Sequence, residues 1–115
     1  MGPGERLADM KPNTAPTDDE GYLLDPLDWS EAFARTVAAK ENIELSEDHW
    51  DVIRFMRDFY QTRQVAADAR FVIKHLSQRY GTDARNRLFE LFPYGYVKQA
   101  CKIAGMKRPR AWSTG

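Results

Sequence analysis

Apolar residues in the middle of the chain recur with the period of an α-helix. The strongest pattern covers residues 49–62 (HWDVIRFMRDFYQT), where apolar positions stand three or four residues apart and alternate with charged ones. A helix with this spacing buries one face, so we expect it to be the central core helix. Its apolar positions are Val52, Phe55, Met56 and Phe59, flanked by Trp50, Ile53 and Tyr60.

Polar residues mark the expected starts of two helices. Ser46 can accept a hydrogen bond from the first turn of the central helix, and Glu47 and Asp48 place negative charge where the helix dipole favours it. Upstream, Asp28 and Ser30 are N-cap candidates for a short amphipathic helix in SEAFARTVAAKEN. The sequence therefore predicts two capped helices before residue 63.

Three further helices are predicted towards the C-terminus. Residues 67–80 repeat the apolar period and stop at Gly81, residues 83–92 stop before a proline, and residues 96–105 close with Gly105. We therefore expect a mainly α fold, a compact bundle of about five short helices. The apolar face of the last helix contains Val97, Ala100, Cys101 and Ala104.

The two ends of the chain lack this periodicity. The first residues are rich in Gly, Pro, Asn and Thr, which predicts a flexible leader over residues 1–18. We expect a helical domain over residues 19–105 and a C-terminal arm over residues 106–115. Tyr22–Leu24 is the one candidate for extended structure.

Length and composition narrow the class of protein. A chain of 115 residues suits one domain, and it contains no apolar run long enough to span a membrane and no signal-peptide region at its start, so we expect a cytoplasmic protein. The single cysteine excludes an internal disulfide. Because His49 and His75 lie far apart in the sequence, we expect no metal site and no cofactor.

The net charge of zero conceals an asymmetry between the two halves. Residues 1–58 hold 14 acidic and 6 basic residues, whereas residues 59–115 hold 3 acidic and 11 basic ones. The basic half could pair with the acidic half, or it could bind an acidic protein or a nucleic acid. The candidate partner-binding residues are Lys98, Lys102, Lys107, Arg108, Arg110 and Trp112.

The only cysteine, Cys101, allows two interpretations. Its place on an apolar face is typical of a packed, inert thiol, because free cysteine is among the most often buried residues. If the thiol is partly exposed, the adjacent Lys98 and Lys102 would favour the thiolate, which is a nucleophile suited to sulfur exchange. Periodicity and charge leave both interpretations open.

Three segments resemble one protein family. EGYL (from Glu20), ELSEDHWDVIRFMRDFY (44–60) and LFPYGYVKQACKIAG (91–105) are similar to the DsrC/TusE family of sulfur-relay proteins, related to the gamma subunit of dissimilatory sulfite reductase, over about residues 19–110. The resemblance implies a compact, mainly helical domain with a flexible C-terminal arm and, as in many members, a small N-terminal β-hairpin. It also implies a carrier, rather than a stand-alone enzyme, that passes persulfide sulfur between protein partners in tRNA thiolation or in sulfur oxidation.

The chain departs from this family at its C-terminus. Members that handle sulfur end in a pattern like CKIAGLPKPTGCV, whose penultimate cysteine carries the sulfur. Cys101 matches the upstream cysteine of that pattern, while Trp112 stands at the position of the arm cysteine. Tyr96 and Val97 also replace the family's usual Pro-Ala. The resemblance therefore makes Cys101 the candidate sulfur acceptor, and a two-cysteine cycle within one chain is impossible.

Two other functions remain open. The protein could be a non-catalytic regulator or adaptor of sulfur metabolism that keeps the binding surface and has lost sulfur transfer. Alternatively, the two helices joined at Gly81 have the lengths of a helix-turn-helix, in which Arg79, Arg85 and Arg87 could contact phosphates of DNA.

Overall fold

The computed structural model describes residues 15–107 and confirms a mainly α fold. This part of the chain contains four α-helices, two short 3₁₀-helices and one π-helix. The α-helices are α2 (Glu31–Lys40), α3 (Glu47–Arg63), α4 (Ala69–Tyr80) and α5 (Ala84–Leu91). The shorter elements are η2 (Pro26–Asp28), η3 (Gly81–Asp83) and the π-helix η4 (Tyr96–Cys101).

The helix starts follow the local chemistry of the sequence. The Ser46 hydroxyl accepts a hydrogen bond from the backbone of His49 (3.4 Å), and the His49 ring accepts one from the backbone of Ser46 (3.0 Å), which completes a capping box at the start of α3. Ser30 caps α2 as predicted. The prediction for Asp28 is wrong, because this residue ends η2, whose cap is Asp25.

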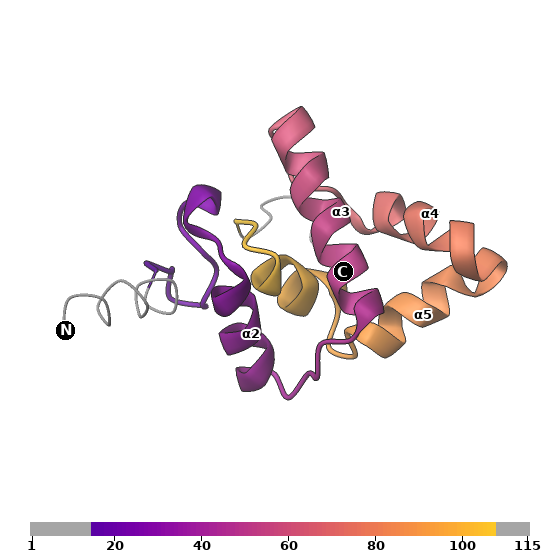
Figure 1. The fold of residues 1–115 in the computed structure, drawn as a ribbon, viewed down its shortest axis with the longest axis horizontal. Coiled ribbons are helices and arrows are strands. Elements are labelled where there is room, and N and C mark those ends of the chain that lie inside the picture. Colours follow the sequence, from indigo (N-terminus) through magenta and orange to yellow (C-terminus); the bar gives the residue numbers. More distant parts are fainter. Residues whose placement is uncertain (1–14, 108–115) are drawn as a thin grey trace.

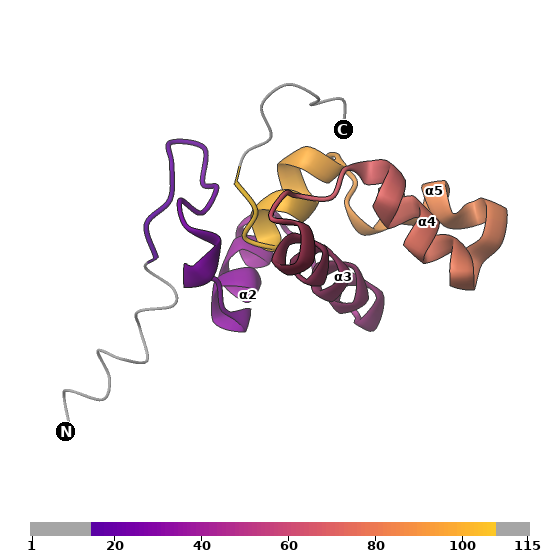
Figure 2. The same ribbon diagram turned by 90° about the horizontal axis from the view of Figure 1, so that it is seen from above.

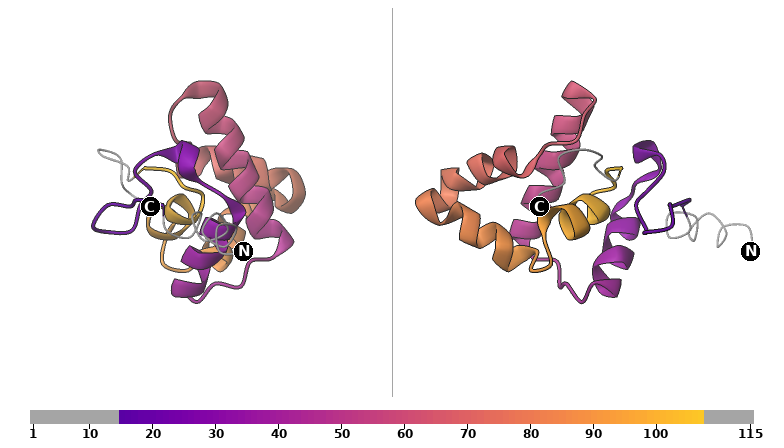
Figure 3. Two further views of the ribbon diagram at one scale, coloured as in Figure 1. Left: turned by 60° about the vertical axis from the view of Figure 1, so that its left-hand side comes forward. Right: turned by 180° about the vertical axis from the view of Figure 1, so that it is seen from behind.

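The helices are arranged around α3, which runs through the centre of the molecule (Figure 1). The antiparallel pair α4 and α5 extends to one side of α3, and α2 lies on the other side, as the view from above also shows (Figure 2). The π-helix η4 lies between α2 and α3, and the rear view shows the same order (Figure 3). Segments distant in the sequence therefore meet at the two ends of α3.

The buried face of α3 differs slightly from the predicted one. Val52, Ile53 and Met56 have no exposed surface, so they form the centre of the core. Phe55 and Phe59 are only partly buried and pack against α4 instead. The Phe55 ring stacks on His75 with centroids 4.4 Å apart, and the Phe59 ring lies 5.0 Å from that of Phe71. The apolar arc is thus wide enough to serve two neighbours.

The expected N-terminal hairpin is a short turn without strands in the part of the chain that the structure describes, with backbone hydrogen bonds from Asp18 N–H to the Tyr22 carbonyl (2.8 Å) and from Leu24 N–H to the Pro16 carbonyl (3.1 Å). Thr17 and Leu23 form an isolated antiparallel bridge, and residues 15–107 contain no strand. The leader predicted for residues 1–18 and the arm predicted for residues 106–115 fall mostly outside the described residues. Within residues 15–107, no helix is long and apolar enough to cross a membrane.

Candidate functional site

Cys101 lies at the end of the π-helix η4 and is completely buried. Its exposed fraction is 0%, as is that of its neighbour Ala100. The N-cap of η4 is Gly95, whose φ of +110° is readily adopted only by glycine, and the helix is followed by one further helical turn before Gly105. π-helical turns are rare and are often found at functional sites, so this segment is a candidate on geometry alone.

Burial controls the chemistry of the thiol. Desolvation raises the pKa of Cys101 to about 12, and a hydrogen bond with the Tyr96 side chain opposes this rise only in part. The thiol therefore lacks the exposure that would let Lys98 and Lys102 lower its pKa. In this conformation the sulfur is a neutral thiol with no access to a donor.

Side chains from other segments hold the helix around Cys101 in place. The Tyr22 hydroxyl donates to the Val97 carbonyl (3.0 Å), and the Trp29 indole N–H donates to the Ile103 carbonyl (2.9 Å). The Tyr96 hydroxyl donates to the carbonyl of Ala67, just before α4. We call these contacts, together with the one from Arg57 described next, the thiol clamp, since they connect η4 and the residues that follow it to other segments.

Arg57 of α3 completes the thiol clamp. Its guanidinium donates to the Ala104 carbonyl (2.8 Å) and to the Pro26 carbonyl (2.9 Å), and it lies over the Trp29 ring, 4.4 Å from the centroid. Burial lowers the pKa of Arg57 from its ordinary value. Gly105 permits this contact, because a Cβ there would lie 2.5 Å from Cδ1 of Trp29. The apolar and charge patterns did not single out Arg57, since they do not indicate which charged residues bind backbone.

The structure separates the predicted partner-binding residues. Lys98 and Lys107 are exposed, whereas Lys102 is partly buried and pairs with Glu41 (Nζ to Oε2, 3.6 Å). The remaining three, Arg108, Arg110 and Trp112, lie outside the described residues. The three described lysines therefore do not form one uniform basic surface around the thiol.

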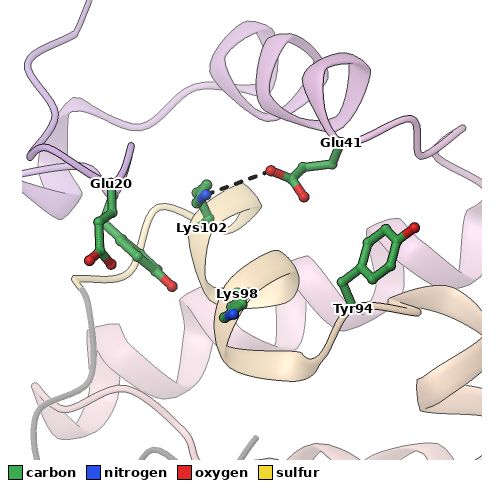
Figure 4. Close-up of a pocket in the computed structure, with 6 residues that line it drawn as sticks. Glu20, Glu41, Tyr94, Lys98 and Lys102 are labelled. Atoms are coloured by element: carbon green, nitrogen blue, oxygen red, sulfur yellow. Dashed lines mark ion pairs between the residues drawn. The ribbon is translucent and has the colours of Figure 1, made fainter.

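Lys98 and Lys102 line a pocket of about 500 Å³ on the outer side of η4. Figure 4 shows Lys98 on this helix between Glu20 and Tyr94, while Lys102 points towards Glu41. The Tyr22 ring completes the wall, and the Lys102 ammonium lies 5.3 Å from its centroid. Mixed charge and two aromatic rings make this pocket suited to a polar ligand or to a partner's side chains.

Gln99 connects this pocket to the interior. Its side chain has no exposed surface, accepts a hydrogen bond from the backbone of Tyr94 (2.9 Å) and donates one to Glu41 (3.1 Å). The pocket wall and the helix that contains Cys101 are therefore one connected structure. No pattern in the sequence distinguishes Gln99 or Glu41, because their roles depend on segments 58 positions apart.

Arginines of α4 and α5 converge on Asp48 at the other end of α3. The Asp48 carboxylate, 8% exposed, accepts hydrogen bonds from Arg79 (2.7 Å), from Arg87 (2.7 and 3.1 Å) and from the Tyr80 hydroxyl. The hydrogen bond from Tyr80 and the charge of Arg87 hold the pKa of Asp48 below its ordinary value. We call this group the Asp48 cluster.

The Asp48 cluster argues against the nucleic-acid interpretation. The two helices are joined through η3 at Gly81, as predicted, but Arg79 and Arg87 are engaged by a carboxylate within the same chain. Only Arg85 of the three predicted phosphate contacts has no ion pair within residues 15–107. The basic half of the sequence thus pairs in part with the acidic half.

The histidines also have structural partners. His49 Nε2 donates to the Leu91 carbonyl (2.8 Å), and burial lowers the pKa of its ring. Nε2 of His75 lies 2.8 Å from Oδ2 of Asp51. Within residues 15–107, no group of three His, Cys, Asp or Glu side chains could hold a metal ion.

The sequence is similar to one protein family and to curated proteins. The family model described as "DsrC like protein" matches residues 9–111. The chain is 43% identical over 105 residues to "Sulfurtransferase TusE" of Pectobacterium atrosepticum, covering 90% of this chain and 96% of that protein. It is 46% identical over 95 residues to "Sulfurtransferase TusE" of Yersinia pseudotuberculosis, covering 81% of this chain and 88% of the relative.

Solved structures give the same result. The oxidized gamma-subunit of the dissimilatory sulfite reductase (DsrC) from Archaeoglobus fulgidus superposes with a TM-score of 0.77 at 34% identity, covering 84% of this chain and 90% of that one. The NMR structure of Allochromatium vinosum DsrC has a TM-score of 0.73 at 39% identity, with coverages of 83% and 87%. The structural similarity therefore covers more than four-fifths of this chain.

Proposed function

The chain belongs to the DsrC-like protein family, and from this premise we propose that it is a sulfur-relay protein whose sulfur acceptor is Cys101. The observation that carries the proposal is the 43% identity, over 90% of the chain, to a protein named sulfurtransferase. Cys101 is the only cysteine in the sequence, so no other thiol of this chain can accept sulfur. The proposed setting is the cytoplasm, where thiols are kept reduced.

The transfer step needs no oxidant. The Cys101 thiolate attacks the terminal sulfur of a donor persulfide, the sulfur–sulfur bond of the donor breaks, and its electron pair leaves with the donor thiolate. The new sulfur–sulfur bond makes Cys101 a persulfide, and the proton lost by the thiol passes to solvent. A second thiol, on the acceptor protein, removes the sulfur by the same exchange.

The geometry adds one condition to this function. Because Cys101 is completely buried and its pKa is raised to about 12, the thiol clamp must open before the sulfur meets a donor. Opening requires the loss of hydrogen bonds from Trp29 and Arg57 to the backbone after Cys101. Local openings of this size are common in proteins and can be driven by the binding of a partner.

Mass analysis of the intact chain after incubation with a cysteine desulfurase and free cysteine tests the proposal. We expect a gain of one sulfur mass that is absent in Cys101→Ser, and faster loading in Arg57→Ala, which lacks one contact of the thiol clamp. Iodoacetamide labelling of Arg57→Ala shows separately that the thiol has become accessible.

If labelled, accessible Cys101 never gains sulfur, the carrier function is wrong. The chain would then act as an adaptor, and wild type and Cys101→Ser would retain the same sulfur-relay proteins in a pull-down. Loss of partners in Cys101→Ser would instead connect binding to the thiol.

A further inference from the structure

Among the residues that the structure describes, the pocket beside η4 contains a lysine without an ion pair. Glu41 is engaged by Lys102 and by Gln99, and Glu20 has an interaction of its own. The exposed Lys98 ammonium forms no ion pair within residues 15–107. An incoming anion would therefore find Lys98 available without first having to displace a carboxylate.

The rim of the pocket adds an aromatic surface. Tyr94 is 75% exposed, although its backbone is fixed by the hydrogen bond to buried Gln99. An exposed tyrosine on a fixed backbone is typical of the residues that dominate protein interfaces, since it offers large contact area at low entropic cost. A small inorganic anion would use Lys98 and leave this ring without a contact.

We propose that this pocket binds an acidic segment of a protein partner, with a carboxylate on Lys98 and an apolar side chain against Tyr94. This deepens the proposed function, on which it rests, by giving the chemistry of the sulfur donor or acceptor protein. The volume of about 500 Å³ suits two or three side chains rather than a whole helix. Lys102, held between Glu41 and the ring of Tyr22, keeps the pocket in shape.

The position of the pocket explains why a partner would bind there. Lys98 and Gln99 belong to the same π-helix as Cys101, so a segment bound in the pocket lies against the element that must move to expose the thiol. Binding at Lys98 and Tyr94 would thus favour the conformation in which the thiol clamp is open.

Selection from a random dodecapeptide library displayed on phage, with the full-length chain immobilised, tests the proposal without a known partner. We expect the recovered peptides to be rich in Asp and Glu with at least one apolar residue. The affinity of a synthetic copy should fall about tenfold in Lys98→Glu and by less in Tyr94→Ala. Lys74→Glu, an equal charge change on the exposed side of α4, should leave the affinity unchanged.

Three outcomes would overturn the proposal. The recovered peptides could lack acidic residues, their binding could be equally strong in Lys98→Glu, or sulfate could bind through Lys98 while no peptide does. Circular dichroism of each variant verifies that it is folded. Since Cys101 takes no part in peptide binding, failure of sulfur loading leaves this result standing, and failure of peptide binding leaves sulfur loading untouched.

Discussion

The two ends of α3 hold their neighbouring segments by opposite means. At the N-terminal end, the Asp48 cluster binds α4 and α5 through full charges, with arginine ends that reach solvent. Towards the C-terminal end, Arg57 and Trp29 donate to backbone carbonyls around a completely buried thiol. Within residues 15–107, Arg57 forms no ion pair with a carboxylate. The first contact depends on protonation, whereas the second depends on close packing.

The comparison shows that nearness in sequence to basic residues does not activate a thiol. Tyr80 and Arg87 lie far from Asp48 along the chain and lower its pKa, while Lys98 and Lys102 flank Cys101 and leave its thiol protonated. A charged group shifts the pKa of another group only where the two interact closely. The thiol of Cys101 is buried, so the cost of its desolvation outweighs any effect of the lysine ammonium groups.

The largest expected effect concerns the reactivity of Cys101. Because burial raises its pKa from the ordinary 9.0 to about 12, alkylation by iodoacetamide at pH 8 should be about a thousandfold slower in the native chain than in urea. The decrease follows from the smaller thiolate fraction alone, and steric closure can only add to it. Equal rates in the two states would mean that the thiol clamp stands open in solution.

Alanine substitutions at two glycines distinguish the energetic cost of disturbed packing from that of backbone strain. Gly105→Ala should lower the free energy of unfolding by about 3 kcal/mol, because it combines a positive φ with a methyl group that overlaps the Trp29 ring. Gly81→Ala has a positive φ but no atom within 4 Å, so about 1 kcal/mol is expected. Urea denaturation of both variants measures the difference, and equal losses would show that the region around Cys101 is loosely packed.

The Asp48 cluster should contribute less to the free energy of unfolding than the close packing at Gly105, and its contribution should fall in acid. Asp48→Asn should cost about 2 kcal/mol, below the range for fully buried pairs because the arginines are partly solvated. The pKa of Asp48 is lowered in the folded state, so its contribution is present above the ordinary value of 3.8 and is lost as pH falls through the folded value.

Denaturation of wild type and Asp48→Asn between neutral pH and pH 3 checks this sign. The two free energies of unfolding should converge in acid. Asp58→Asn, an exposed change on α3 with no ion pair within residues 15–107, is the control and should follow wild type throughout. A difference that grows in acid would contradict the assigned direction of the pKa shift.

Local chemistry accounts for what the sequence alone determined. Ser30 and Ser46 start their helices and Gly81 ends one, because capping and a positive φ involve only neighbours in the chain. The helical class and the family resemblance were also available at that level. The extent of pairing in the N-terminal hairpin was not determined at that level, since pairing depends on contacts that a short extended segment does not specify.

The site depended on tertiary structure. Periodicity placed Cys101 on an apolar face and so allowed burial, but the raised pKa follows from complete burial in a segment held by side chains as distant as Tyr22 and Trp29. The sequence also shows how many basic residues the C-terminal half contains, yet only the fold decided that Arg87 is engaged by Asp48 while Lys98 is exposed and has no ion pair within residues 15–107. Charge and apolarity are properties of residues, whereas solvation and pairing are properties of positions in space.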